Sequence, residues 1–258
     1  MLTLRSVSGP CGPLGIDDTG SGEHAPVLFV HADAGNATQW REALDQVRPQ
    51  RRAVALDLRG CGRSAHPADG DHSIGARADD VAAVVKALGL EQVILVGHSG
   101  GALVALHYAA QHAAQVAGLL LVDPANDGRQ FPADKRQQFM QLLRSPQYSK
   151  TARDYYTSIA GANADVRDRV LWDLQAASPD TVIGTFEALA SYDPLPALKA
   201  YVGPRLMLVT PASDTPASIR RLDPTLRFQT IEHTGHWIQL DDPIGFADTL
   251  KRFSADLG

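Results

Sequence analysis

The chain has 258 residues, of which 44% are hydrophobic, and a formal net charge of −5. It is therefore long enough to bury one sizeable core, and its mild charge gives no support to binding of nucleic acid or of an anionic membrane. No apolar run approaches ~20 residues, which predicts no membrane span. Cys11 and Cys61 form neither a disulfide framework nor a metal-ligand pattern, so no metal is expected. The N-terminus lacks a basic segment followed by an apolar one, which predicts a cytoplasmic protein without a signal peptide.

Short apolar runs alternate with helical patterns over the first half of the chain. Strands are expected at residues 2–7, 14–17, 27–30, 52–58, 93–97 and 116–122. Helices are expected from Asn36 or Thr38, at 74–88 with Ser73 as the N-cap, and at 101–113. This alternation predicts a mostly parallel sheet with helices on both faces, because parallel strands need crossover connections.

The composition changes between residues 125 and 192, where apolar β-branched runs disappear. Helices are expected there at 133–144, 148–160, 163–177 and 179–191. Strands return at 205–209 and 226–231, and a last helix begins at Asp242 and Pro243. We expect residues 124–192 to form an inserted helical cap over a core of residues 1–123 and 193–258, because the insertion carries more large aromatic rings than an outer layer of helices needs.

The segment Gly97-His98-Ser99-Gly100-Gly101 lies between an apolar strand pattern and an Ala/Leu-rich helical pattern. In this strand–turn–helix context, Gly-x-Ser-x-Gly is typical of a nucleophilic serine. A β-carbon at position 97 or 101 would collide with the backbone of so tight a turn. The N–H of Gly100 would point to where a negative oxygen forms. We therefore predict that Ser99 is a nucleophile and not an ordinary helix cap.

A serine nucleophile needs a base, which is itself oriented by an acid. Among nine histidines, His236 is the best candidate, because it follows the last expected strand in a loop that begins at Gly235. His233 is nearer the strand end and fits a structural role. His31 and His98 border the two turns that would build the site, and we expect them to fix these turns and not to catalyse.

Four stretches, at residues 31–40, 57–64, 97–101 and 235–243, together resemble the α/β-hydrolase superfamily in its capped, lipase- or esterase-like branch. The resemblance covers nearly the whole chain. It implies an eight-stranded, mostly parallel sheet, a helical cap and a triad in the order Ser, acid, His. It also implies an oxyanion hole formed by the backbone N–H groups of Gly100 and Asp33. The substrate pocket is expected to include His31, Trp40, His98 and Trp237.

The sequence departs from the family pattern at the oxyanion turn. The usual His-Gly pair is His31-Ala32 here, and Asp33 follows it. A carboxylate that faced the developing negative charge would oppose it. We therefore expect the Asp33 side chain to point away and bond the turn, with only its N–H serving the site. The alternative is a side chain that points in and binds a cationic or hydroxylated group of the substrate.

The acid of the triad is the second departure. The family's usual acid follows the strand at 205–209 in a Gly-x-x-Asp pattern, but here the counted position falls on Ser213, with Asp214 one residue later. Some branches place the acid one strand earlier, where this chain has Asp123 before a proline. Asp214 is the first candidate and Asp123 the second, and the remaining alternatives are Asp127 or no acid at all.

A serine at position 99 argues against the chemistry of haloalkane dehalogenases and epoxide hydrolases, which need a carboxylate nucleophile. The prediction is a serine hydrolase that cleaves a small carboxylic ester or lactone through an acyl-enzyme, without a cofactor. The alternatives are a C–C bond hydrolase, lyase or cofactor-free perhydrolase with the same triad, and a non-catalytic ligand-binding protein. We expect a small-molecule substrate as the partner, and a monomer or homodimer.

Overall fold

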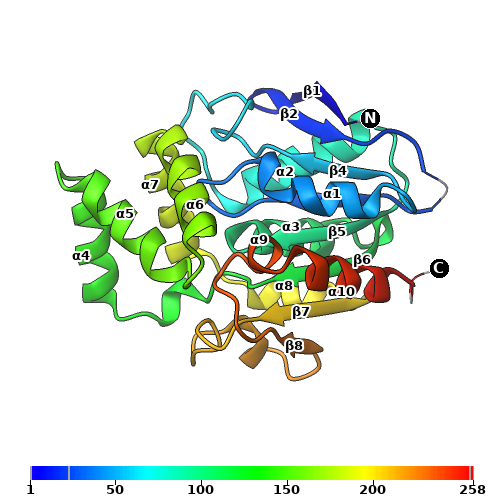
Figure 1. Ribbon diagram of the computed structural model, residues 1–258. Coiled ribbons are helices and arrows are strands. Elements are labelled where there is room, and N and C mark those ends of the chain that lie inside the picture. The colour runs from blue at the N-terminus through cyan, green and yellow to red at the C-terminus, as the bar shows by residue number, and fades with distance from the viewer. Residues whose placement is uncertain (1, 23, 256, 258) are drawn as a thin grey trace.

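The computed structural model describes residues 2–22, 24–255 and 257. Its centre is an eight-stranded sheet in the order β1-β2-β4-β3-β5-β6-β7-β8 (Figure 1). The strands β1 and β2 form an antiparallel hairpin, and β2 is antiparallel to β4. All other neighbouring strands are parallel. The strands are β1 (Thr3–Gly9), β2 (Gly12–Asp18), β3 (Val27–Val30), β4 (Ala53–Leu56), β5 (Val93–His98), β6 (Val116–Val122), β7 (Arg205–Val209) and β8 (Phe228–Thr230). The predicted mostly parallel sheet is thus confirmed.

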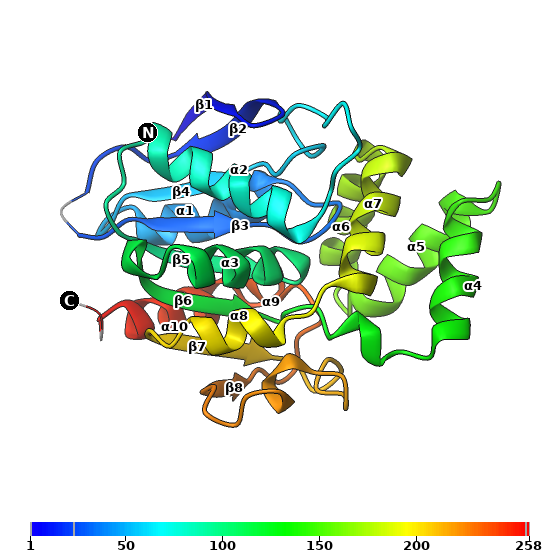
Figure 2. The same cartoon turned by 180° about the vertical axis from the view of Figure 1, so that it is seen from behind.

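Helices cover both faces of this sheet (Figures 1 and 2). One face packs against α2 (Ile74–Ala87), α3 (Gly100–Gln111) and α8 (Leu195–Ala200). The other packs against the 3₁₀ turn Ala37–Trp40, α1 (Arg41–Val47), α9 (Ile238–Asp241) and α10 (Pro243–Ala255). Successive residues of a strand point to opposite faces, so Leu28 and Leu95 enter the first core and Phe29 and Val96 the second.

Four more helices stand together at one end of the sheet: α4 (Ala133–Leu143), α5 (Tyr148–Ile159), α6 (Ala164–Ala176) and α7 (Pro179–Ser191) (Figures 1 and 2). They share an apolar cluster of their own, into which Trp237 of the core also packs. The parallel strands β5 and β6 end on this side. Ser99 and Asp123 directly follow these strands, and both line a cavity together with residues of α5 and α7. The four helices lie within two residues of their predicted bounds, while the treatment of residues 124–192 as a separate domain stays a prediction.

Several helix starts follow the predicted capping chemistry. The Ser73 hydroxyl accepts a hydrogen bond from the Ala76 N–H at 3.2 Å, which satisfies one of the unpaired donors in the first turn of α2. Ser178 caps α7 in the same way, directly before Pro179. The short helices α8 and α9 were not predicted, because six and four residues are too few to display a helical period.

No helix within the described part of the chain has the length and apolar character needed to cross a membrane.

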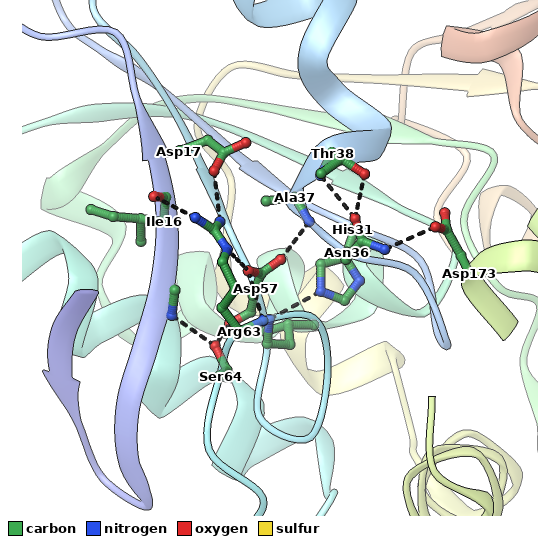
Figure 3. Close-up of polar contacts among 12 residues, drawn as sticks. Ile16, Asp17, His31, Asn36, Ala37, Thr38, Asp57, Arg63, Ser64 and Asp173 are labelled. Carbon is green, nitrogen blue, oxygen red and sulfur yellow. Dashed lines mark hydrogen bonds and ion pairs between the residues drawn. The ribbon is translucent and has the colours of Figure 1, made fainter. Parts of the chain in front are cut away.

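A polar network ties the loop between β3 and α1 to the segment that follows β4 (Figure 3). Asp57, after β4, accepts hydrogen bonds from the Ala37 N–H at 2.6 Å and from Nε of Arg63 at 2.9 Å. Nε2 of His31 accepts a hydrogen bond from the Leu58 N–H at 3.0 Å. The loop that carries Asp33 is therefore held at the end of the sheet where the cap helices lie.

Candidate active site

Ser99 is the single residue between β5 and α3, where the chain bends sharply. Its φ of 55° and ψ of −123° lie outside the regions that non-glycine residues normally occupy. A Cβ at Gly97 would lie 2.4 Å from the Gly101 carbonyl oxygen, and a Cβ at Gly101 would lie 2.2 Å from that of His31. The predicted steric need for both glycines is thus confirmed. Backbone strain of this kind costs about 1–3 kcal/mol and is concentrated at functional sites.

The carboxylate that meets His236 is that of Asp123. Nδ1 of His236 donates a hydrogen bond to Oδ2 of Asp123 at 2.6 Å. Asp123 directly follows β6, is fully buried and has a positive φ of 37°. A positive φ is costly for a residue with a side chain, and such strain is concentrated at functional sites.

The sequence-based preference for Asp214 as the partner of His236 is corrected by this geometry. The Asp214 carboxylate is held by Arg220, whose Nε donates at 2.6 Å, and by Arg221. The remaining alternative, Asp127, accepts hydrogen bonds from Nε and NH2 of Arg129, both at 2.9 Å. Both carboxylates are therefore engaged by arginines close to them in the sequence.

The loop after β7 supplies the other partners of Asp123. The Thr210 N–H donates to Oδ1 of Asp123 at 2.8 Å, and the Ser213 hydroxyl donates to the same oxygen. Burial alone would raise the pKa of Asp123, but the hydrogen bonds from His236, Ser213 and Thr210 outweigh it, so the pKa lies below its usual value. Asp123 is consequently an ionised carboxylate beside His236.

His98 and His31 are buried and have structural contacts. Nε2 of His98 donates to the backbone carbonyl of His236 at 2.8 Å, and its Nδ1 accepts from the Gln239 amide at 3.2 Å. Burial lowers the pKa of His98 well below its usual value, so it stays neutral. Nδ1 of His31 donates to the Ala32 carbonyl at 2.7 Å. The two rings fix their turns, as predicted.

A cavity of about 490 Å³ lies between the sheet end and the cap helices. Ser99, Asp123 and His236 line it from the core. The cap contributes a largely apolar wall, formed by Phe131, Tyr155, Tyr156, Ile159, Phe186 and Leu189.

The expected substrate-pocket residues are only partly found in this cavity. Trp237 lines it, whereas His31, Trp40 and His98 are not among its described lining residues. Trp40 is fully buried and packs against Phe29 and Phe246 in the core beneath the turn. The prediction for these three residues is therefore wrong, because their rings are consumed by packing and by hydrogen bonds to the turns.

Asp33 also lines the cavity. The expectation that its side chain bonds its own turn is wrong, because the carboxylate is bonded to α2 instead. Its Oδ1 accepts a hydrogen bond from NH1 of Arg77 in α2 at 2.5 Å, and its backbone carbonyl accepts one from the Tyr156 hydroxyl at 3.1 Å. Among the described residues, the Asp33 N–H donates no hydrogen bond. Gly100 is the first residue of α3, where N–H groups have no partner within the helix.

Sequence reasoning missed several residues that support this site. The family pattern singles out Ser213 only as the usual position of the acid, and it does not predict the hydrogen bond from this hydroxyl to Asp123. Arg77 gives no signal, because an arginine on a helix is ordinary until its partner is known. Tyr156 is one of the aromatic residues that favour a cap, but the sequence does not predict its bond to Asp33. Their contacts with Asp33 span 44 and 123 residues of sequence.

Comparisons with known proteins agree with this architecture. A family model described as "Alpha/beta hydrolase family" matches residues 27–249. The N-formylmaleamate deformylase of Pseudomonas putida is 28% identical, over 87% of this chain and 87% of its own. The mouse sn-1-specific diacylglycerol lipase ABHD11 is 27% identical, over 89% of this chain and 80% of its own.

Solved structures support the same fold. The esterase EaEST of Exiguobacterium antarcticum superposes with a TM-score of 0.85 at 21% identity and covers 97% of this chain and 99% of its own. At this identity the likeness concerns the fold alone. The family model, which spans most of the sequence, goes further: the chain belongs to the alpha/beta hydrolase family.

Proposed function

We propose that this protein is a serine hydrolase that cleaves a small carboxylic ester or lactone through an acyl-enzyme. The observation that carries the proposal is the 2.6 Å hydrogen bond between His236 and Asp123, in a cavity that Ser99 also lines. A serine hydroxyl becomes an effective nucleophile only beside such an oriented base. The names of the relatives, a lipase, a deformylase and an esterase, are compatible with this chemistry.

In the first half-reaction, Oγ of Ser99 attacks the carbonyl carbon of the substrate while Nε2 of His236 takes up its proton. Asp123 stabilises the imidazolium through the bond to Nδ1. The tetrahedral intermediate then collapses, and His236 returns the proton to the departing alcohol oxygen. Ser99 is left as an ester of the acyl group.

In the second half-reaction, His236 removes a proton from water, which attacks the acyl carbon. The bond from the acyl carbon to Oγ of Ser99 then breaks, His236 returns the proton to Oγ, and the carboxylic acid is released. Both tetrahedral intermediates carry a negative oxygen, for which the N–H groups of Gly100 and Asp33 are the proposed donors. Each such donor contributes on the order of 3 kcal/mol of transition-state stabilisation. Apart from the substrate and one water molecule, every group in the two proposed half-reactions belongs to this chain.

The cavity favours small substrates with apolar groups. Its volume of about 490 Å³ is in the range of small-molecule sites, and the aromatic wall of the cap offers apolar contact to an acyl or alkyl group. Acetate and butyrate esters of p-nitrophenol and a five-membered lactone are therefore suitable first substrates.

Covalent labelling tests the proposal. A fluorophosphonate probe should label the wild-type protein stoichiometrically and Ser99→Ala not at all, with Ser191→Ala, an exposed serine of α7, as the matched control. Mass spectrometry of the protein quenched during p-nitrophenyl butyrate turnover should find one butyryl group on Ser99. An unlabelled wild-type protein that still binds the esters would favour a ligand-binding protein, and labelling without ester or lactone turnover would favour C–C bond or perhydrolase chemistry.

A further inference from the structure

The Asp33 carboxylate lies directly against the first residue of α3. A Cβ built on Gly100 would stand 1.9 Å from Oδ2 and 2.7 Å from Oδ1 of Asp33. Only 7% of the Asp33 surface is exposed. A negative charge this close to Gly100, the residue whose N–H is proposed to stabilise the negative oxygen, opposes that oxygen, and poor hydration strengthens the repulsion. The site therefore needs a means of offsetting this charge.

Arg77 supplies the opposite charge from the first turns of α2, which begins on the cap side of the sheet (Figure 2). Its side chain is 1% exposed, and NH1 donates to Oδ1 of Asp33 at 2.5 Å. Within the described residues, its Nε and NH2 find no hydrogen-bond partner, so Asp33 is the only residue there to which the guanidinium is bonded. Burying an arginine with two unpartnered nitrogens is unfavourable, and such a pair is weak evidence for a contribution to stability.

The other buried carboxylates near the loop have arginines of their own. Asp57 is bonded by Arg63 at 2.9 Å, and Asp80 by NH2 of Arg59 at 2.8 Å. Neither Asp57 nor Asp80 is among the residues that line the cavity. Of these three ion pairs, only the pair of Arg77 and Asp33 joins a buried arginine to a residue that lines the cavity.

We infer that Arg77 is a positioning residue of the reaction, which neutralises Asp33 and holds its carboxylate away from the reacting oxygen. The inference rests on the proposed serine-hydrolase function and deepens it. Arg77 does not touch the substrate. It allows the N–H groups of Gly100 and Asp33 to act on the oxyanion without interference from the adjacent carboxylate.

Two variants separate this electrostatic role from a purely structural one. Arg77→Gln keeps the aliphatic stem and a polar end group but leaves the carboxylate without a counter-charge. The double variant Arg77→Gln/Asp33→Asn removes both charges and keeps the backbone N–H of residue 33. Arg51→Gln is the control, since Arg51 is a buried arginine bonded to the carbonyls of Ala25 and Ser254 outside the cavity.

Arg77→Gln is expected to lower kcat for p-nitrophenyl butyrate by about 10- to 100-fold with a change in KM of less than about threefold, because the carboxylate acts on the transition state and not on ground-state binding. The double variant should recover at least about tenfold of this loss, and Arg77→Lys, which keeps the charge, should stay within about fivefold of the wild type. Arg51→Gln should lower the melting temperature and leave kcat unchanged.

A kcat in Arg77→Gln equal to that of the wild type would overturn the inference, as would a double variant no faster than Arg77→Gln. If Arg77→Gln does not fold, the double variant, which contains no unpaired charge, carries the test: a kcat more than about 100-fold below the wild type would contradict the electrostatic role. Fluorophosphonate labelling of the wild type, performed in parallel, reports on the proposed function separately. If the wild type were not labelled, both the proposed function and this inference would be contradicted.

Discussion

The hydroxyl of Ser213 donates a hydrogen bond to the carboxylate of Asp123, although the two residues follow different, neighbouring strands, β7 and β6. Ser213 occupies the position at which the family pattern places the acid of the triad. Its hydroxyl instead donates to Asp123, which follows the neighbouring strand. Asp123, with its positive φ, combines this bond with the bond from His236. The carboxylate thus lies on the loop after β6, while its donors Thr210 and Ser213 lie on the loop after β7.

Asp123→Asn tests which carboxylate serves His236. We expect kcat to fall by about three to four orders of magnitude, because an amide at this position favours the wrong tautomer of the histidine and cannot stabilise its charged form. Asp214→Asn is the matched control and should stay within about threefold of the wild type, since Asp214 bonds Arg220 instead. Steady-state kinetics on p-nitrophenyl butyrate would contradict the assignment if the two variants behaved the other way round.

Ser213→Ala probes the hydrogen bond to Asp123. Hydrogen bonds to charged groups contribute about 1.5–3 kcal/mol, and the Thr210 N–H and His236 remain after this one is lost, so kcat should fall about tenfold. The pKa of Asp123 should rise toward its ordinary value at the same time. Ser213→Thr retains the hydroxyl and is expected to recover most of the activity. Equal rates for the Ala variant and the wild type would show that the bond has no effect on catalysis.

Gly97→Ala is expected to lower the free energy of unfolding by about 1–3 kcal/mol or more, because its Cβ would lie 2.4 Å from the backbone oxygen of Gly101. Gly75→Ala in α2 is a suitable control. The nearest atom to its Cβ is 3.7 Å away, and alanine is a better helix former, so this variant should gain about 0.5–1 kcal/mol. Urea unfolding followed by circular dichroism measures both, and a neutral Gly97→Ala would contradict the steric argument.

Three buried histidines make stability sensitive to acid. Burial lowers the pKa of His31, His98 and His72, the last to about 4. In the unfolded chain each has a pKa of about 6.5, so the unfolded state takes up protons first as the pH falls. Their contribution to stability is therefore complete above about pH 6.5 and is lost below it, with a slope of up to about 1.4 kcal/mol per pH unit for each proton.

His72→Gln should reduce this slope by one proton between about pH 6.5 and 4. Urea unfolding at several pH values gives the slope directly for the wild type and the variant. Parallel curves for the two proteins would mean that His72 is not held neutral in the folded state.

Local sequence determined the helices and strands, the bend that carries Ser99 and the loop that carries His236. The strands at 27–30, 116–122 and 205–209 have their predicted bounds. Strands that are buried on both faces consist of nearly continuous apolar residues, so their ends can be recognised in the sequence. The bend at Ser99 followed from the steric needs of its two glycines. The loop of His236 could be chosen because one glycine-led segment follows the last strand.

Only the tertiary structure decided which carboxylate meets His236 and what offsets the charge of Asp33. Asp123 and His236 are 113 residues apart, and Asp33 and Arg77 are 44 residues apart. Such pairs depend on which strands are neighbours and on how loops cross the sheet end, and neither is encoded in the residues beside them. Arg220 also decided the outcome, because it binds Asp214, the carboxylate that the sequence pattern favoured.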